Sequence, residues 1–222
     1  STRRVCEEIV ALGRELDLSE ADLLLAEAAA LLHDVGRFRQ LKKYGTFVDQ
    51  HSVDHAQLGV TVIQEQKWLA GLSQTERQML EDAVACHNRV AIPPDKTGRA
   101  LLLIKSLRDA DKLDIWHVAI NNYQAPAAGQ DAFVNLDLPD DDRVSPDVLQ
   151  SIYQSRSVDN RTVKSRNDLK LLQISWVFDL NFDQSVAQVK ARNIVPAIFA
   201  TMPASDSNQA AFDHVQSYLK KR

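Results

Sequence analysis

Glycine and proline are scarce in this chain of 222 residues, which contains only seven of each. The residues that most often interrupt helices are therefore few. Several segments carry apolar residues at the i, i+3, i+4 spacing of amphipathic helices, and none alternates apolar and polar residues as a half-buried strand does. We predict an all-α fold with enough apolar residues, 45% of the chain, to bury a sizeable core.

The chain also has few cysteines, no net positive charge and no long apolar run. Cys6 and Cys86 lie far apart and form no Cys-x-x-Cys pair, which fits a reducing cytoplasm better than a disulfide framework. The net charge of −4 argues against binding to a nucleic-acid polymer or an anionic membrane. Charges interrupt every apolar stretch well short of a membrane span, and the first residues, Ser-Thr-Arg-Arg, begin no signal peptide. We expect a cytoplasmic protein whose phosphate ligands, if any, are bound by local groups.

Hydrophobic periodicity and capping residues predict where the helices lie. Ser19 with Asp22 indicates one helix start, and Ser73 with Glu76 indicates a capping box at another. Residues 35–54 are predicted to form a polar loop, whose length suggests a function. The predicted helices cover residues 2–16, 20–32, 53–70, 74–86, 98–123, 146–154, 167–180, 184–199 and 205–220, with Pro196 kinking or ending the penultimate one.

Four short segments place metal-ligating residue types at predicted helix ends or on apolar helix faces. They are His33-Asp34, Asp54-His55, Cys86-His87 and Asp109-Ala-Asp111. Imidazole and carboxylate together suit transition metals. Because a buried, ionised aspartate is costly unless it is paired or metal-bound, an apolar helix that ends in His-Asp requires an explanation. The alternative is that Asp34 accepts hydrogen bonds from the following loop and His33 is a satisfied helix-end residue.

Asp111 is the acidic residue of its segment that we expect to point inward. It follows Leu107 by four residues and therefore shares the apolar face of the predicted helix. Asp109 and Asp114 are expected to be solvated or paired with neighbouring basic residues, at little energetic consequence.

These segments resemble the HD-domain superfamily of metal-dependent phosphohydrolases, whose pattern is an early His, a His-Asp doublet at a helix end and a later Asp. Residues 29–37, Ala-Ala-Leu-Leu-His-Asp-Val-Gly-Arg, resemble the doublet segment, and residues 108–114, Arg-Asp-Ala-Asp-Lys-Leu-Asp, resemble the last-Asp segment. The resemblance covers residues 1–123. It implies an HD-domain helical bundle over residues 1–123, with additional C-terminal helices in residues 124–222 that form an extension packed on this core.

Some branches of the superfamily bind two metal ions and supply further histidines. Residues 55–59, His-Ala-Gln-Leu-Gly, and residues 86–88, Cys-His-Asn, resemble those segments. The resemblance implies one metal ion held by His33, Asp34 and Asp111, and a second held by His55, His87 and a bridging Asp34. It implies one or two divalent ions, with Fe, Mn, Zn, Ni, Co and Mg as the candidates.

The chain departs from the family pattern at two positions. Cys86 stands where the two-metal branch often has another His; a thiolate ligand is one interpretation, and a buried thiol is the one we expect. No histidine precedes His33, and residues 2–5, Thr-Arg-Arg-Val, resemble the segment after the early His. Ser1 therefore either replaces that His, which would weaken metal binding, or follows a residue absent from this chain.

Arg37 is the residue we expect to orient a phosphate group, because a guanidinium donates two parallel hydrogen bonds and similar families often have Lys or Arg there. Lys42, Lys43 and Lys112 are secondary candidates for this contact. We expect Lys42 and Lys43 to be solvated instead, and the alternative for Lys112 is a surface ion pair with Asp109. We expect His51 to lie in an exposed loop, His117 to have a structural role and His214 to lie on the surface.

The leading hypothesis is hydrolysis of a phosphomonoester or phosphodiester, with a nucleotide among the candidate substrates, by metal-activated water. Asp34 and Arg37 are its catalytic candidates. The alternative is a catalytically weak HD-fold module that binds a nucleotide or a metal and regulates, and a third reading is a helical interaction protein without a metal. Residues 36–50 and 88–96 are expected to line the substrate pocket.

Overall fold

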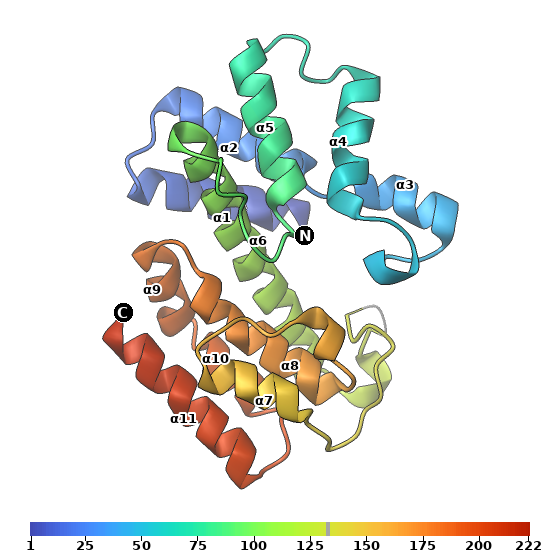
Figure 1. The fold of residues 1–222 in the computed structure, drawn as a ribbon, viewed down its shortest axis with the longest axis vertical. Coiled ribbons are helices and arrows are strands. Elements are labelled where there is room, and N and C mark those ends of the chain that lie inside the picture. The colour runs from blue at the N-terminus through green and yellow to red at the C-terminus, as the bar shows by residue number, and fades with distance from the viewer. Residues whose placement is uncertain (132–133) are drawn as a thin grey trace. The chain divides into compact units, whose positions relative to one another are not determined.

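A computed structural model describes residues 1–131 and 134–222, and every regular element within those ranges is helical (Figure 1). The predicted all-α fold is confirmed. Within the same ranges, no helix has the length and hydropathy needed to cross a membrane. The chain forms two compact units, residues 1–114 and residues 115–222. Their boundary lies inside α6 (Gly98–Gln124), so the domain division after residue 123 stays a prediction.

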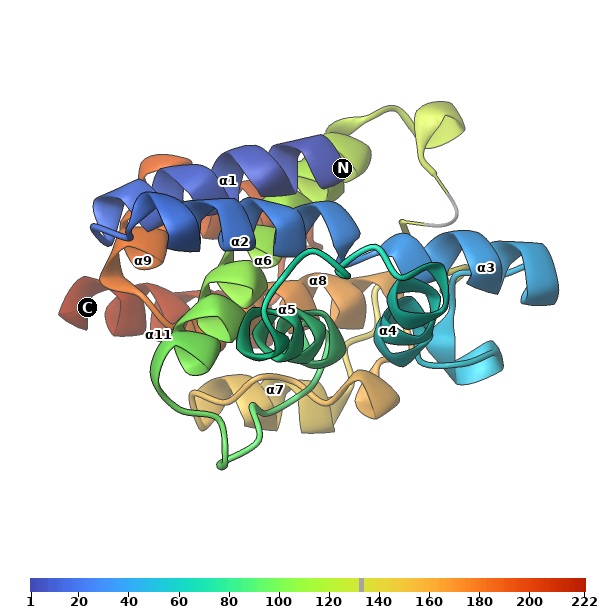
Figure 2. The same cartoon turned by 90° about the horizontal axis from the view of Figure 1, so that it is seen from above.

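The first unit is a bundle in which α1 packs on α2, α2 on α5, α5 on α4 and α4 on α3 (Figures 1 and 2). Its elements before α6 are α1 (Thr2–Glu15), α2 (Glu20–Leu32), α3 (Val35–Tyr44), the short 3-10 helix η1 (Asp49–His51), α4 (His55–Gln66) and α5 (Gln74–Cys86). The core is made by the apolar faces of α1, α2, α5 and α6, including Ile9, Ala29, Leu80 and Ile104, and α4 adds Ile63. Burial of a large aliphatic side chain contributes about 1.5–3 kcal/mol.

The predicted helix starts in this unit are confirmed. The Ser19 hydroxyl accepts a hydrogen bond from the main-chain nitrogen of Asp22, and Ser73 and Glu76 form the capping box. The predicted loop at residues 35–54 is wrong, because its first half is the helix α3. This helix buries only Gly36 and Gln40 and therefore lacks the apolar periodicity by which a helix is recognised in a sequence.

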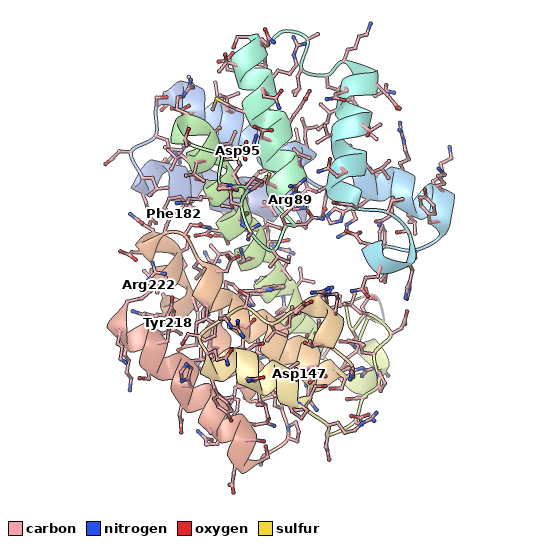
Figure 3. The ribbon with its side chains drawn as sticks, viewed as in Figure 1. Arg89, Asp95, Asp147, Phe182, Tyr218 and Arg222 are labelled. Atoms are coloured by element: carbon pink, nitrogen blue, oxygen red, sulfur yellow. The ribbon has the colours of Figure 1, made fainter. Side chains whose placement is uncertain are left out.

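The second unit is built around α8 (Arg166–Ser175), in which every residue after the first is buried. It packs against α7 and α10, while α11 packs against α7 and α9 against α10. The other elements are η2 (Ala127–Gly129), α7 (Pro146–Tyr153), η3 (Asn160–Thr162), η4 (Trp176–Asp179), α9 (Asp183–Ala191), α10 (Ile194–Phe199) and α11 (Asp206–Lys221). Arg222, labelled in Figure 3, pairs with Asp183 at 2.7 Å.

The predicted helix over residues 184–199 is two helices, and Pro196 does not cause the break. The chain turns at Asn193, whose φ of 50° lies in the left-handed region, where Asn is better tolerated than most residues. Pro196 lies in the first turn of α10. Its missing N–H costs nothing there, because the first amides of a helix have no intrahelical acceptor.

Candidate metal centre

The five residues predicted as metal ligands converge in the first unit, each from a different helix or helix end. His33 is the C-cap of α2, and Asp34 is the N-cap of α3. His55 is the first residue of α4, His87 is the C-cap of α5, and Asp111 lies within α6. Helices and helix ends that meet at one place thus bring together residues as far apart in the sequence as His33 and Asp111.

A glycine, Gly36, allows α3 and α4 to approach main chain to main chain. A Cβ atom on Gly36 would overlap the carbonyl oxygen of His55 and would lie 2.6 Å from the nitrogen of Gly59. No side chain larger than hydrogen fits at Gly36 without moving one of these helices. The glycine of the His-Asp-x-Gly segment therefore allows His55 to lie beside Asp34, which is a packing role rather than a chemical one.

The rings of His33 and His87 are oriented by main-chain carbonyls. Nδ1 of His33 lies 2.7 Å from the carbonyl oxygen of Ala30, and Nδ1 of His87 lies 2.8 Å from that of Val84. These oxygens belong to the last turns of α2 and α5, where carbonyls have no helical partner. Because a carbonyl oxygen only accepts, each Nδ1 carries the hydrogen and donates it. In both residues, Nε2 is therefore left for a ligand.

His55 is oriented by a side chain instead. Its Nδ1 lies 2.6 Å from Oδ2 of Asp49, and its Nε2 lies 3.0 Å from Nε2 of His87. With both Nδ1 atoms acting as donors, the two Nε2 lone pairs would face each other unless a proton or a cation lies between them. This arrangement fits a bound metal ion, since neutral imidazole nitrogens and carboxylates are ligands of divalent transition metals.

The carboxylate of Asp34 faces all three histidines. Its Oδ2 lies 3.4 Å from Nε2 of His33, and its Oδ1 lies 3.4 Å from Nε2 of His55 and 3.9 Å from Nε2 of His87. Although Asp34 occupies the N-cap position of α3, its side chain makes no capping hydrogen bond; its contact in the following segment is Nε of Arg37, 3.5 Å from Oδ1. The side chain is 41% exposed, whereas those of the histidines are at most 5% exposed. Asp34 is thus the solvent-facing member of the group.

Asp111 points inward, as predicted, and its Oδ1 lies 3.5 Å from Nε2 of His33. Asp109 and Asp114 were expected to be solvated or paired with neighbouring basic residues; both are buried, so the solvated alternative is wrong, and the pairing of Asp109 stays a prediction. Asp114 pairs with Arg4 at 2.6 Å and with the amino group of Ser1. These partners lie more than a hundred positions away in the sequence, so they cannot be predicted from the sequence around Asp114.

Charges are distributed unevenly over the centre. Burial alone would lower the pKa of His33, but hydrogen bonds with Asp111 and Asp34 outweigh it and raise that pKa to about 11. Burial lowers the pKa of His87 to about 4. Burial opposes ionisation of Asp34 and Asp111, yet the adjacent His33 lowers the pKa of both carboxyl groups. In the absence of metal, one proton therefore resides on His33 and both carboxylates are ionised at neutral pH.

The guanidinium of Arg37 makes most of its hydrogen bonds to neighbouring side chains and to the main chain of the segment after α3. Its Nη1 donates to the carbonyl oxygen of Phe47 at 2.6 Å, to Oδ1 of Asp49 at 3.1 Å and to Oε1 of Gln40 at 3.1 Å. Its Nε lies 3.5 Å from Oδ1 of Asp34. Arg37 thus fixes the segment after α3 against the centre, and its contact with a phosphate stays a prediction.

Asp49 is a residue of the site that the sequence did not reveal. Burial opposes its ionisation, but the hydrogen bond with His55 and those from its other neighbours lower its pKa. The only signal in the sequence was the unusual length of the polar segment in which it lies. Asp49, Asp54 and His55 also bring ligand atoms within 4.8 Å of one another, as do Asp34, His55 and His87. Asp54, however, caps α4 and accepts a hydrogen bond from Asn88 at 2.9 Å.

The turn that carries His87 is fastened by a buried arginine. Nη1 of Arg108 donates to the carbonyl oxygens of Cys86 at 3.1 Å and Arg89 at 2.5 Å, on either side of His87. Figure 3 labels Arg89 on the segment that joins α5 to α6. Cys86 itself lies in the hydrophobic core, and burial raises the pKa of its thiol. It is the buried thiol that we expected.

The other predicted residues lie outside this group. Lys42, Lys43 and His51 are exposed, as expected. Lys112 is buried, so it does not lie on the surface as expected, and its pairing with Asp109 stays a prediction. In the second unit, His117 is exposed and lies 3.0 Å from the amide nitrogen of Asn121, and the half-buried His214 lies 2.8 Å from the hydroxyl of Ser155.

Fold and site together define an all-helical protein whose clustered imidazoles and carboxylates are suited to hold divalent metal ions. The family model of the HD domain matches residues 2–116, just over half of the chain, and the chain belongs to this family. HD domains are generally metal-dependent hydrolases. A search of curated proteins and a search of solved structures found no match.

Proposed function

We propose that this protein is a metal-dependent phosphohydrolase that uses water to cleave a phosphomonoester or a phosphodiester. The observation that carries the proposal is the approach of Nε2 of His55 to Nε2 of His87, 3.0 Å apart and both facing Oδ1 of Asp34. Both rings already donate through Nδ1, so their Nε2 atoms are set to accept a cation rather than to donate. Membership of the HD-domain family supports the same reading.

The two oxygens of Asp34 face different partners, which suits a bridging carboxylate. Oδ1 faces His55 and His87, whereas Oδ2 faces His33. We infer that His55, His87 and Asp34 would hold one ion, and that His33, Asp111 and Asp34 would hold the other. A bound divalent ion supplies an acidified water and offsets negative charge on phosphoryl oxygens.

The protein's own groups would position the reactants. Asp34, half exposed beside buried imidazoles, is placed to orient a water and to accept its hydrogen bond. Arg37 is our candidate for the phosphate oxygens, because it lies next to Asp34 and offers a rigid fork of N–H donors. The buried rings of His33, His55 and His87 exclude water from the other side. A small phosphorylated molecule, with nucleotides among the candidates, is the substrate class that we propose.

The test is a comparison of metal-loaded wild type with Asp34→Ala on a panel of generic phosphomonoesters, phosphodiesters and nucleotides. We expect the variant to lose at least about a hundredfold in rate, the lower range for a group that orients a proton transfer. Glu65→Gln is the matched control, because it also removes one carboxylate but lies in an exposed pair with Arg39. Equal hydrolysis by wild type and Asp34→Ala would refute the proposal.

One observation favours a second function, a catalytically weak module that binds a nucleotide or a metal and regulates. His33 pairs with Asp34 and Asp111 at 3.4 Å and 3.5 Å, so these three residues satisfy one another without an ion. Such a module should be stabilised against heat by a nucleotide that it does not consume. Consumption of every nucleotide that raises the melting temperature would contradict this alternative.

A further inference from the structure

Asp49 accepts hydrogen bonds from four side chains. Its Oδ2 accepts from Nδ1 of His55 at 2.6 Å and from Nδ2 of Asn88 at 3.5 Å. Its Oδ1 accepts from Nε2 of Gln40 at 2.8 Å and from Nη1 of Arg37 at 3.1 Å. The carboxylate thus has one oxygen committed to the metal centre and the other to α3.

The side-chain amide of Gln40 determines which oxygen of Asp49 faces α3 and which faces His55. Gln40 is fully buried, and its nitrogen also contacts the hydroxyl of Ser52 at 2.9 Å and the carbonyl oxygen of Val53 at 3.0 Å. Its oxygen accepts from Nη1 of Arg37 at 3.1 Å. Because the nitrogen must face the Val53 carbonyl and the oxygen must face the arginine, the amide cannot be turned over. Oδ1 of Asp49 therefore has to be an acceptor.

We propose that Asp49 is a positioning residue of the metal centre, whose carboxylate holds the ring of His55 with Nδ1 protonated so that Nε2 faces Asp34 and His87. The inference deepens the proposed function and rests on it. It separates His55 from His33 and His87, whose Nδ1 atoms are held by main-chain carbonyls that no side-chain substitution removes. A carboxylate in this place also makes the imidazole a more basic ligand.

The proposal makes Asp49→Asn as harmful as Asp49→Ala, or more so. In the Asn variant, the amide oxygen stays with the two donors, Gln40 and Arg37, that already meet Oδ1. The amide NH₂ then faces Nδ1 of His55 and forces that atom to accept, which moves the hydrogen to Nε2 and blocks it as a ligand. In the Ala variant, a water can take the place of the carboxylate and accept from Nδ1. A residue that only braced the loop would show the opposite order, because Asn keeps more of the hydrogen bonds than Ala.

The experiment measures Zn²⁺ affinity by competition with a chromogenic chelator in wild type, Asp49→Asn, Asp49→Ala and the control Glu65→Gln. The melting temperature of each metal-free protein is measured alongside. We expect both Asp49 variants to bind Zn²⁺ about 10–100-fold more weakly, with Asn at least as weak as Ala, and the control to match wild type. The d–d absorption of the Co²⁺-loaded proteins should change in the same two variants, because one nitrogen ligand is lost or displaced.

The outcomes separate this inference from the proposed function. Unchanged Zn²⁺ affinity in both Asp49 variants, or Asn binding more tightly than Ala in step with the melting temperatures, would overturn the positioning role alone. The expected Zn²⁺ pattern in a wild type that hydrolyses no phosphoester would overturn the proposed function and leave the positioning role standing. A wild type that binds no Zn²⁺ would overturn both.

Discussion

The candidate metal centre has two sides that are built differently. On one side, which we call the helix-end side, His33, His87 and Asp111 come from α2, α5 and α6, and both imidazoles are held by main-chain carbonyls. On the other side, which we call the network side, Asp34 lies at the N-terminal end of α3 and His55 at the N-terminal end of α4.

The helix-end side rests on the hydrophobic core, to which α2, α5 and α6 contribute. On the network side, α4 also contributes Ile63 to this core, but the positions of Asp34 and His55 rest on a glycine contact and on hydrogen bonds among side chains. Geometry on the first side therefore follows from the fold, whereas geometry on the second depends on individual side chains that can be removed one at a time. The following substitutions and conditions test this difference, from the largest expected effect to the smallest.

Gly36→Ala should break the network side. The added methyl group meets the main chain of His55 and Gly59, which cannot rotate away as a side chain would. We expect a loss of about 3 kcal/mol in the free energy of unfolding, the upper range for overpacking, together with loss of Zn²⁺ binding. Urea denaturation and chelator competition measure the two effects.

The control is Gly71→Ala, because a Cβ atom there meets nothing within 4 Å. It should leave stability within about 0.5 kcal/mol of wild type, as surface substitutions usually do. Gly36→Ala as stable as Gly71→Ala would show that α3 and α4 do not need their close contact.

Arg108→Met should loosen the turn that carries His87 on the helix-end side. It removes the guanidinium from the carbonyl oxygens of Cys86 and Arg89, and a hydrogen bond with a charged group contributes about 1.5–3 kcal/mol. We expect reduced stability and weaker Zn²⁺ binding, since His87 lies between the two carbonyls. Full affinity in a destabilised variant would mean that the core alone positions His87.

Metal binding should release a proton from the helix-end side. His33 has a pKa of about 11, so it is protonated at neutral pH and must lose that proton for Nε2 to bind a metal ion. Affinity should therefore rise by about tenfold per pH unit between pH 7 and pH 9 if one proton is displaced. Calorimetry in buffers of different ionisation enthalpy counts the protons, and a count of zero would show that no metal ion binds at His33.

The metal-free protein should show the opposite trend. The pKa of His33 is raised from 6.5 to about 11 in the folded protein. The stability that this shift contributes is fully present below pH 6.5 and is lost as the pH rises toward 11. Metal-free stability should thus fall over the alkaline range in which Zn²⁺ affinity rises.

Lys42→Ala combined with Lys43→Ala should change least. Both side chains are exposed near the end of α3, where charge interactions are screened by solvent and salt. We expect the melting temperature to shift by less than about 2 °C, with unchanged Zn²⁺ affinity. A marked loss of phosphoester hydrolysis in this variant would place the lysines in substrate binding and extend the network side to the end of α3.

The same contrast explains what the sequence could and could not predict. His33 and His87 end recognisable helices and Asp111 lies within one, so periodicity and capping residues were enough to place them on these helices. Their grouping around a metal ion was implied by the family resemblance. The helix α3 was missed because it buries little apolar surface, and its key contacts are hydrogen bonds of Gln40 and Arg37. Periodicity carries no information about such contacts.

Charged residues show a second limit. Asp114 looked like one member of a local ion pair on a helix surface, yet it is buried and paired with Arg4 across 110 positions of sequence. Asp49 lay in a segment without any regular pattern, and only the fold brings its carboxylate to His55. Pairings over such distances follow from the packing of helices and not from the neighbours of a residue in the chain.

The unequal exposure of the centre has a kinetic consequence. Asp34 is 41% exposed, while the three imidazoles are buried, so solvent reaches the group from the carboxylate side. Substrate would enter and phosphate would leave by that same approach. Inorganic phosphate should therefore inhibit hydrolysis by raising the apparent KM for substrate while leaving the maximal rate unchanged.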